Sequence, residues 1–386
     1  MLIRTLVLLA LTAAAAAAQT DVAIHFLKVE QARPPVLSNL DPVPGDLGVQ
    51  GARLGVVENN TTGRFLGQSY ALSESAVAPD GDALAAARAA LAETPLLVLE
   101  APAEALAAIA DLPEAEGALL FNAGSGDAAL RGQGCRANLL HALPSTAMRT
   151  DALAQFLVRK RWERLAMVVG PRPEDQAFAE SMRASLRKFG LKLRQEKPWL
   201  EDADIRRSAS TEVPLFTQGL GEYDALILAD EARDFGRYIL YNTWEPRPVA
   251  GSEGLVPVAW SRVVEQWGAA QLQSRFEAQA GRAMRDEDYA AWAAVRAIGE
   301  AVTRTGAADP ATLRAYLLGP EFELGGFKGR PLSFRPWNGQ MRQPIPLVHP
   351  RAVVAQAPLE GFLHQRTELD TLGIDEGEST CERFTQ

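Results

Sequence analysis

Three carboxylates stand close together after an apolar run in the second half of the chain. The run Tyr223 to Leu228 (YDALIL) has the composition of a buried strand, and Asp230, Glu231 and Asp234 follow it. Carboxylates at the end of a strand can bind a cation or an amine. They can also cap a helix N-terminus and face solvent, which is the more ordinary role. The EF-hand spacing and its central glycine are missing, so no calcium loop is predicted.

Sequence motifs of enzymes are mostly missing. The segment NAGSGD, which contains Asn122, Gly124 and Ser125, superficially resembles a nucleophile elbow, but Ala123 stands where that motif needs glycine. There is no GxxxxGK[ST] phosphate loop, and no GxGxxG follows the first strand. The four histidines are far apart in the sequence: His25, His141, His349 and His364. We therefore predict a protein that is not an enzyme and has no cofactor and no metal site.

Aromatic side chains are a second kind of candidate. Trp260 and Trp267 enclose the segment WSRVVEQW, just after the apolar run LVPVAW. An aromatic ring at the carboxyl end of a sheet can form one wall of a ligand cleft, and it can equally pack in a core. Both interpretations stay open for Trp260, whereas Trp267 is expected to be structural.

The elements that must position these residues are clearest between Ser145 and Leu193. A helical pattern precedes the strand-like run LAMVV at 165–169, and GPRP then breaks the chain. Phe178, Met182 and Leu186 recur every four residues, as the core stripe of a second helix does. A strand–helix–strand unit of this kind belongs in a parallel sheet. Because ligands of such sheets lie beyond the carboxyl ends of the strands, residues 170–178 are placed to contact one.

The rest of the chain alternates in a similar way. In the first half, strands are expected at 21–27, 68–73, 96–99 and 117–121, and helices at 51–59, 82–91 and 103–110. Further along, strands are expected at 223–228, 255–260 and 346–354 (interrupted by Pro350), helices at 271–280 and 289–303, and a mostly irregular tail from 359. The pattern predicts the α/β class with doubly wound parallel sheets.

Length and charge restrict the function. A chain of 386 residues is too long for one ordinary core, so two domains are expected. The net charge of −9 argues against a nucleic-acid partner. Residues 1–18 (MLIRTLVLLALTAAAAAA) have the charged, apolar and small-residue regions of a secretory signal peptide. The protein is therefore expected to be periplasmic, with a short membrane anchor as the alternative. No later segment is apolar for long enough to span a bilayer.

The two cysteines, Cys135 and Cys381, lie far apart in the sequence. An oxidising compartment permits a disulfide between them, which would tie the C-terminal tail to the first half of the chain. The sequence does not show that the two side chains meet, so two unpaired thiols remain an alternative.

Four segments together resemble the type I periplasmic substrate-binding proteins of ABC importers, the group that contains the leucine/isoleucine/valine-binding proteins. They are QGARLGVVENN, STAMRTDALAQFLVRKRWERLAMVVG, DYAAWAAVRAIGEAVTRTG and FELGGFKGRPLSFRPWNGQMRQPIPLV, and the likeness covers about residues 20–355. Three phrases look closer to the branch found with pyrroloquinoline-quinone-dependent alcohol dehydrogenase systems: WSRVVEQWGAAQL, RPWNGQMRQPI and EGFLHQRTELDTLGID.

The resemblance implies two doubly wound domains joined by a three-segment hinge. The N-terminal lobe would hold residues 20–144 and 261–336, and the C-terminal lobe would hold 145–260 and 337–386. A small-molecule ligand would be held between the lobes as they close about the hinge. The resemblance further implies a monomer that delivers this ligand to ABC permease subunits without inserting into the membrane itself.

The resemblance also implies a ligand site in the first lobe. Family members hold an amino-acid head group with the loops after the third and fourth strands, which correspond to Glu100-Ala101 and to residues 122–125 (Asn-Ala-Gly-Ser). Ser125 matches the hydroxyl position that takes the ligand carboxylate. Gly124 keeps the backbone open for close approach.

In the second lobe this chain departs from the family pattern. Ala177-Phe178 replace the usual Tyr-Gly, and no carboxylate stands near Trp260-Ser261, where the family has its acidic residue for the ligand ammonium. Asp230 or Glu231 could substitute. We therefore expect an aromatic or alcohol-derived ligand, which suits Phe178 and Trp260, over a branched-chain amino acid. Alternatives are a metal- or quinone-cofactor-binding or sensing protein of the same system and, with less support, a hydrolase using Ser125.

Overall fold

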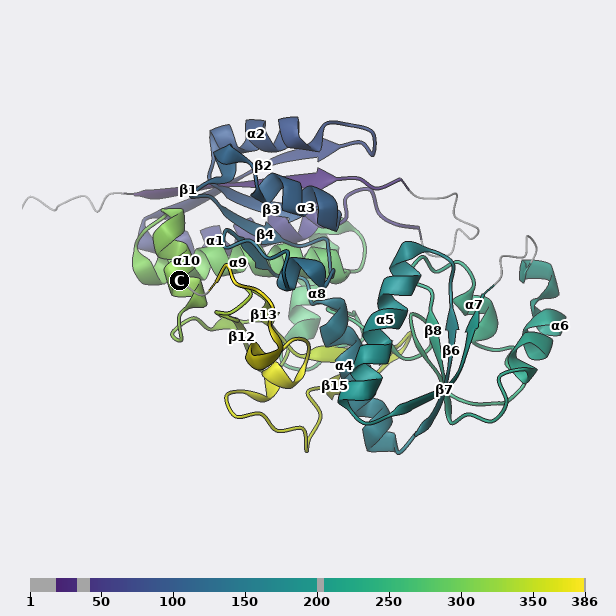
Figure 1. The fold of residues 1–386 in the computed structure, drawn as a ribbon. Coiled ribbons are helices and arrows are strands. Elements are labelled where there is room, and N and C mark those ends of the chain that lie inside the picture. Colours follow the sequence, from purple (N-terminus) through teal and green to yellow (C-terminus); the bar gives the residue numbers. More distant parts are fainter. Residues whose placement is uncertain (1–18, 33–41, 200–204, 385–386) are drawn as a thin grey trace, which may run out of the picture.

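The structure is a computed structural model that describes residues 19–32, 42–199 and 205–384, so the expected signal peptide at 1–18 lies outside the described residues. Two lobes, each built on a parallel sheet, make up most of the molecule (Figure 1). Among the described residues, none of the helices has the length and apolar character that crossing a bilayer requires.

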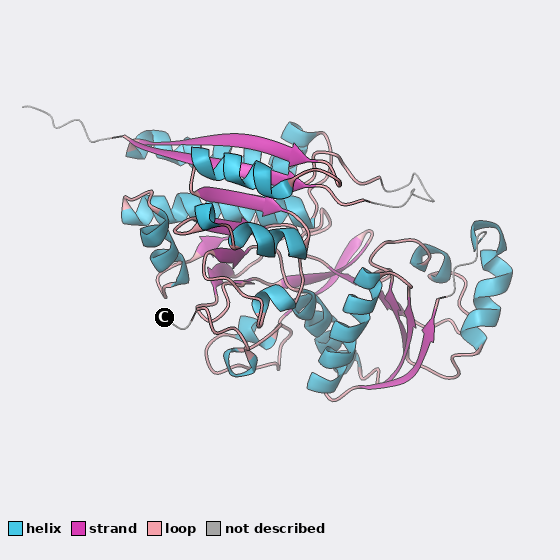
Figure 2. Ribbon diagram, turned by 45° about the horizontal axis from the view of Figure 1, so that its top comes forward, coloured by secondary structure: helices cyan, strands magenta, loops and turns pink. Residues whose placement is uncertain are grey.

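The first sheet has five parallel strands in the order β2-β1-β3-β4-β5. They are β1 (Thr20–Val29), β2 (Gln68–Val77), β3 (Leu96–Glu100), β4 (Leu119–Asn122) and β5 (Leu139–His141). One face is covered by α2 (Ala83–Glu93) and α3 (Ala103–Ala110), and the other by α1 (Val49–Leu66) and α9 (Asp286–Thr305) (Figure 2). The central strands are buried on both faces, which explains the uninterrupted apolar run in β3.

The second sheet is parallel too, in the order β7-β6-β8-β9. Its strands are β6 (Arg164–Val169), β7 (Lys192–Pro198), β8 (Ala225–Ala229) and β9 (Val249–Gly251). It is covered by α4 (Thr146–Lys160) and α5 (Pro173–Lys188) on one face, and by α6 (Ile205–Gln218) and α7 (Gly236–Ile239) on the other. The two parallel sheets are doubly wound, so the predicted α/β fold class is confirmed.

Short antiparallel pieces connect the two parallel sheets. One group pairs β10 (Val256–Pro257), β14 (Ile345–His349) and β15 (Ala352–Ala357), and another pairs β11 (Leu324–Gly325), β12 (Pro331–Phe334) and β13 (Met341–Arg342). The remaining elements are α8 (Ala269–Ala280), α10 (Pro310–Leu318) and the 3₁₀ turns η1 (Pro113–Ala115), η2 (Ala129–Arg131), η3 (Glu368–Thr371) and η4 (Glu376–Glu378).

The chain passes between the two parallel sheets three times: after β5, after β10 and after β13. A buried network holds the first and third crossings side by side. Gln340 donates from Nε2 to the carbonyls of His141 (3.2 Å) and Leu143 (3.1 Å) and accepts from Arg131 Nε (2.7 Å). Gln343 donates to the carbonyl of Ala142 (2.8 Å). Burial lowers the pKa of Arg131 to about 9.

Two predicted strands differ from the structure. The strand expected at 255–260 forms a ladder of only two residues, Val256–Pro257, and its partner β14 is antiparallel. Leu255 forms a parallel bridge with Ala250 instead, and Val258 N–H still donates to the Pro346 carbonyl (3.0 Å). The strand expected at 346–354 is a hairpin, β14–β15, with Pro350 in its turn. The short strands β5 and β9 and the helix α6, which contains Pro214, were not predicted.

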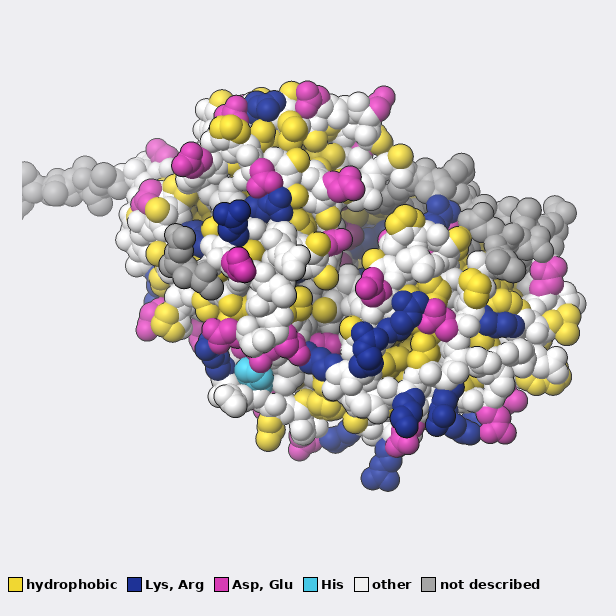
Figure 3. All heavy atoms as spheres, in the orientation of Figure 1, with side chains coloured by type: hydrophobic (Ala, Val, Ile, Leu, Met, Phe, Trp, Pro, Cys, Tyr) yellow, Lys and Arg dark blue, Asp and Glu magenta, His cyan; other side chains and the backbone are white. Residues whose placement is uncertain are grey.

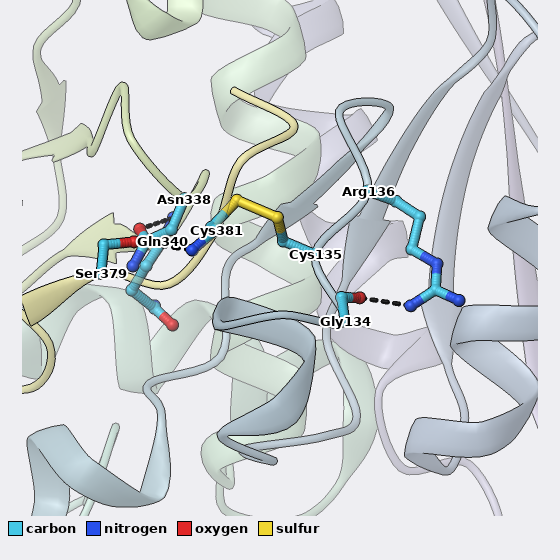
Figure 4. Close-up of a disulfide and its surroundings, with 7 residues drawn as sticks. All are labelled: Gly134, Cys135, Arg136, Asn338, Gln340, Ser379 and Cys381. Carbon is cyan, nitrogen blue, oxygen red and sulfur yellow. Dashed lines mark hydrogen bonds between the residues drawn. A yellow bond between two sulfur atoms is a disulfide. The ribbon is translucent and has the colours of Figure 1, made fainter. Parts of the chain in front are cut away.

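Cys135 and Cys381 form a disulfide with a Cα–Cα distance of 5.7 Å (Figure 4). Cys135 follows η2 in the first lobe, and Cys381 lies in the C-terminal tail. Both are buried in the core that also contains α9. The tail therefore packs against the first lobe at its end, and the alternative of two unpaired thiols is not the one observed.

A glycine allows the close contact between α1 and α9. A Cβ atom at Gly51 would lie 1.8 Å from the carbonyl oxygen of Asp288, a backbone atom that cannot move without shifting α9. We expect Gly51→Ala to lower the free energy of unfolding by about 1–3 kcal/mol, because overpacking outweighs the helix propensity that alanine adds. Urea unfolding measures this change.

The matched control is Gly45→Ala, since a Cβ atom there meets nothing within 4 Å. This control is expected to stay within about 0.5 kcal/mol of the parent protein. Equal stability of the two variants would contradict the proposed reason for Gly51.

Candidate ligand site between the two lobes

The carboxyl edge of the first sheet carries Glu100 and Asn122 at the ends of β3 and β4. Glu100 lies 3.1 Å from Lys28 Nζ as an ion pair whose side chains are 11% and 12% exposed. Asn122 is fully buried and accepts with Oδ1 from the N–H groups of Gly124 (3.0 Å) and Ser125 (2.9 Å). Its amide donates to the Ser125 carbonyl (2.7 Å). Asn122 therefore shapes the loop that follows β4.

Gly124 brings two loops into contact. A Cβ atom there would lie 2.5 Å from the backbone nitrogen of Ala101, in the loop after β3. The missing side chain at Gly124, which was expected to let a ligand approach, instead lets the two loops contact each other. Ser125 is half-buried, and its Oγ accepts from Asp127 N–H (3.2 Å). Among the described residues no acceptor is found for its hydroxyl hydrogen, which remains available to a solute oxygen.

Asp230 caps a helix in the second lobe. Its Oδ1 accepts from Asp234 N–H (2.8 Å), and its Oδ2 accepts from the N–H groups of Phe235 (3.0 Å) and Gly236 (2.6 Å) at the start of α7. Burial raises the pKa of Asp230, while these hydrogen bonds favour the charged form. Both oxygens have backbone donors, so capping, the more ordinary of the two roles considered for this carboxylate, is the one observed.

Glu231 forms a two-point ion pair with Arg149 of α4. The guanidinium donates to its two carboxylate oxygens at 2.7 and 3.2 Å, and Ser252 Oγ donates to it at 2.9 Å. Burial opposes the charged form of Glu231, but Arg149 outweighs burial and lowers its pKa. Arg149 also donates from Nε to the Pro257 carbonyl (3.1 Å), next to the second crossing. The pair links the carboxyl edge of the second sheet to the hinge.

Phe178 and Trp260 have their rings in the core. Phe178 is fully buried between α5 and the second sheet, and the Arg149 guanidinium lies over its ring at 5.6 Å. Trp260 is 3% exposed, stacks on Tyr289 with centroids 4.9 Å apart, and donates from Nε1 to Gln273 (2.8 Å). The structure exposes no face of either ring, which corrects the expectation that they form an aromatic wall. Both rings fill space between helices and strands, where close packing leaves no room for a solute.

The sequence reasoning missed a set of charged residues at the start of α9. Asp286 accepts from Trp260 N–H (2.9 Å) and has an electrostatic interaction with Arg149 in the opposite lobe. Burial and then the neighbouring Asp286 raise the pKa of Glu287, whereas Arg233 from the loop after β8 lowers it. Charges of both signs therefore face each other between the lobes.

A second missed carboxylate is Glu253, in the loop after β9. A Cβ atom at Gly236 would lie 2.8 Å from its Cγ, which places it beside the capped end of α7. The sequence signal for this residue was a strand followed directly by two polar residues, Ser252 and Glu253. It was missed because β9 has only three residues and was not recognised as a strand. The acidic run at 286–288, in the first turn of α9, carried a similar signal, but this helix was predicted only from Tyr289 onwards.

The surface is hollowed where the two lobes face each other (Figure 3). On this face Lys and Arg side chains gather over α5 with Asp and Glu among them. Two other surface hollows of about 720 and 730 Å³ lie elsewhere: one in the tail around His364 and Asp375, and one between Trp267 and β15. Neither is lined by any of the predicted ligand residues.

A buried lysine lies at the third crossing. Lys328 Nζ donates to Gln343 Oε1 (2.6 Å) and to the Pro344 carbonyl (3.2 Å), and it lies 4.3 Å from the ring centroid of Tyr289. Burial lowers the pKa of Lys328 to about 7, and the nearby Asp286 opposes this change only in part. The hinge thus contains an amine that titrates near neutral pH.

Comparison with known proteins supports the fold. No protein-family model and no curated protein matches the chain. Among solved structures, it is similar to a branched-chain amino acid ABC transporter periplasmic ligand-binding protein from Burkholderia xenovorans, with 16% identity over 87% of this chain and 95% of that chain and a TM-score of 0.68. A periplasmic binding protein from Burkholderia mallei has 16% identity over 94% and 98% of the two chains and a TM-score of 0.66.

A third neighbour is the leucine-, isoleucine-, valine-, threonine- and alanine-binding protein from Brucella ovis in a closed conformation. It has 14% identity over 86% of this chain and 89% of that chain and a TM-score of 0.67. At these identities the likeness establishes the fold, which is that of the type I periplasmic binding proteins. The neighbours named here are binding proteins and not enzymes.

The buried amine makes stability depend on pH. Below about pH 7, Lys328 is charged in both the folded and the unfolded chain, so the full cost of burying the charge applies. Between about pH 7 and 10 the unfolded chain binds the extra proton, so the free energy of unfolding rises with pH by up to about 1.4 kcal/mol per pH unit from this group. We expect Lys328→Met to remove this contribution.

Urea unfolding at pH 7.5 and 9 measures the effect as a difference between parent and variant, which cancels groups common to both. Lys192→Met is the control, because Lys192 is exposed at the start of β7. Identical pH dependence in the parent and Lys328→Met would contradict a neutral-range titration of this amine.

Proposed function

We propose that this chain is the periplasmic solute-binding component of an ABC transporter. The two lobes, expected from the sequence at 20–144 with 261–336 and at 145–260 with 337–386, would close over a small organic solute and present it to permease subunits. In the structure β13 and the end of the tail pack on the first lobe. The observation that carries the proposal is the pair of doubly wound parallel sheets joined by three crossings, in a fold like that of periplasmic binding proteins, since ligands of such sheets lie beyond the carboxyl ends of the strands. The chain would act as a monomer and without catalysis.

The charges between the lobes favour a solute with both an anionic and a cationic group. The Ser125 hydroxyl and the remaining N–H groups of Arg149 suit a carboxylate. Burial and Asp286 raise the pKa of Glu287 more than Arg233 lowers it, so this carboxyl suits the cationic group of a solute. An amino-acid-like solute satisfies both sets. The burial of Phe178 and Trp260 removes the reason for preferring an aromatic or alcohol-derived solute.

A link to pyrroloquinoline-quinone-dependent alcohol oxidation is a finer part of the proposal. It rests on the three phrases that resemble that branch of binding proteins. The alternative of a metal-binding protein has less support. The described residues contain no group of three or more His, Cys, Asp or Glu side chains that could hold a metal ion, and Asp230 and Glu231 are engaged in capping and ion pairing.

Isothermal titration with a panel of amino acids and matched aromatic alcohols tests the proposal. The informative variant is the double replacement Arg149→Met with Glu231→Gln, which leaves no buried charge unpaired. We expect the parent protein to bind at least one amino-acid-like solute, and the variant to bind it at least about tenfold more weakly, a change of about 1.4 kcal/mol.

The control is Arg164→Met. Arg164 also pairs with a carboxylate, Asp224 at 2.8 Å, but at the amino edge of the same sheet. The affinity of the Arg164→Met variant for the amino-acid-like solute should match that of the parent protein. Binding of an aromatic alcohol with equal affinity in all three proteins would overturn the assignment of the ligand class and of the site.

A further inference from the structure

The segment after β15 contacts both lobes. On the side of the first lobe, Asp370 is 1% exposed and accepts from Arg335 Nε (2.8 Å) and Arg342 Nε (2.8 and 3.0 Å). Arg335 also donates to the carbonyls of Leu369 (3.1 Å) and Leu372 (2.6 Å). Arg335 and Arg342 lie at the two ends of the β12–β13 turn, and the paired strand residues Phe334 and Met341 beside them belong to the core around α9. Residues 369–374 therefore wrap around a buried guanidinium.

The same few residues bind the second lobe. Gly373 donates its N–H to Asp151 of α4 (2.7 Å), and its carbonyl accepts from Lys188 at the end of α5 (2.8 Å). Lys188 and Asp151 form an ion pair at 2.9 Å, of which the Asp151 side chain is 4% exposed. Leu372 is fully buried with α4 residues Met148, Ala152 and Phe156. Residues 371–373 are thus fixed to the second lobe by polar and apolar contacts together.

The end of the tail returns to the first lobe. Cys381 is joined to Cys135 there, and Figure 4 shows the disulfide connecting the tail to the loop of Cys135. Phe384 lies in the first-lobe core, where a Cβ atom at Gly339 would meet its ring at 2.7 Å. The eight residues from Ile374 to Cys381, joined by seven Cα–Cα steps, can span at most about 25 Å when fully extended. Part of that length is taken up in η4.

We propose that residues 369–381 form a strap, a fourth connection between the lobes that limits how far they open. The three crossings allow rotation about the hinge, because each is a single chain segment. The strap adds a link beside the first and third crossings that is anchored in α4 and α5 at one end and covalently in the first lobe at the other. It holds the empty protein partly closed. The proposal rests on the proposed function only in assuming that the lobes move.

Small-angle scattering of the solute-free protein tests the strap by cutting it at either end. One variant carries Cys135→Ala and Cys381→Ala. A second carries Asp151→Asn, Lys188→Met and Leu372→Ala, which remove the ion pair and the apolar contact on the second lobe. We expect each variant to have a larger radius of gyration than the parent. The cysteine variant keeps the ion pairs of Asp370 with Arg335 and Arg342, so its expansion should be smaller than that of the second variant. The combination should be no larger than the second variant alone, since a strap released from α4 and α5 carries no tension.

The control is Arg366→Ala with Glu376→Ala, an exposed ion pair within the tail whose side chains are 54% and 49% exposed. Its radius of gyration should equal that of the parent. If the cysteine variant fails to fold, the folded parent is treated with a dithiol. Two electrons and two protons pass from the dithiol to the disulfide, which leaves two protein thiols and an oxidised reagent. Circular dichroism verifies that each sample is folded.

An unchanged radius of gyration in folded protein with the disulfide opened would overturn the strap. So would an additive increase in the combined variant, because it would mean two independent contacts. The test does not need a known solute. Expansion of the cut variants together with no binding of any amino-acid-like compound would sustain the strap and reject the proposed function, and the reverse pattern would do the opposite.

Discussion

The arrangement of the two lobes depends on a buried hydrogen-bond network around Gln340. Arg131 and Gln340 are each 1% exposed, and together they occupy the carbonyls that the first crossing leaves unpaired. A buried carbonyl without a donor costs about 1–3 kcal/mol, so any shift of one crossing against the other is opposed by several such groups at once. The network thereby fixes which loops of the two sheets can face each other. The ion pair of Arg149 and Glu231 then extends this order into the second lobe.

Much of the fold could be predicted because its signals are local. The apolar run at 96–99 and the stripe of Phe178, Met182 and Leu186 each report a strand or a helix face without knowledge of the rest of the chain. Short elements escaped this reasoning: β5 and β9 have three residues each, fewer than periodicity can detect. The strand expected at 255–260 is shorter in the structure because Leu255 pairs with Ala250 of β9 and only Val256–Pro257 form a ladder with β14, a division that depends on the partner strands and not on composition.

The candidate site was harder to predict than the fold. Position at the end of a strand was a sound guide to Glu100, Asn122 and Glu231, all of which lie at carboxyl edges. Their chemistry depended on partners far away in sequence. Glu231 is engaged because Arg149 reaches it from α4, and Trp260 packs on Tyr289 because the second crossing passes beside α9. Long-range contacts of this kind cannot be derived from the spacing of residues in the sequence. The same holds for the electrostatic interaction between Arg149 and Asp286, which lie in different lobes.

The charges between the lobes, the hinge and the tail all act on the equilibrium between open and closed lobes. A solute that carries both signs would satisfy charges that face each other between the lobes, and so stabilise the closed arrangement in proportion to its affinity for that state. The disulfide-anchored tail acts on the same equilibrium from the outside. Removing the network around Gln340 would disturb all of these together, whereas the site and the tail can each be altered alone.

Native mass spectrometry of the protein, purified without denaturation and compared with the same protein after unfolding and refolding, shows whether the lobes hold a solute. We expect a bound organic molecule with an amino-acid-like composition that is lost on unfolding. On re-addition it should bind again and stabilise the folded chain, as a ligand specific for the folded state must. A protein that carries no organic molecule, and gains mass only when a metal ion is added, would rule out the proposed role in solute binding.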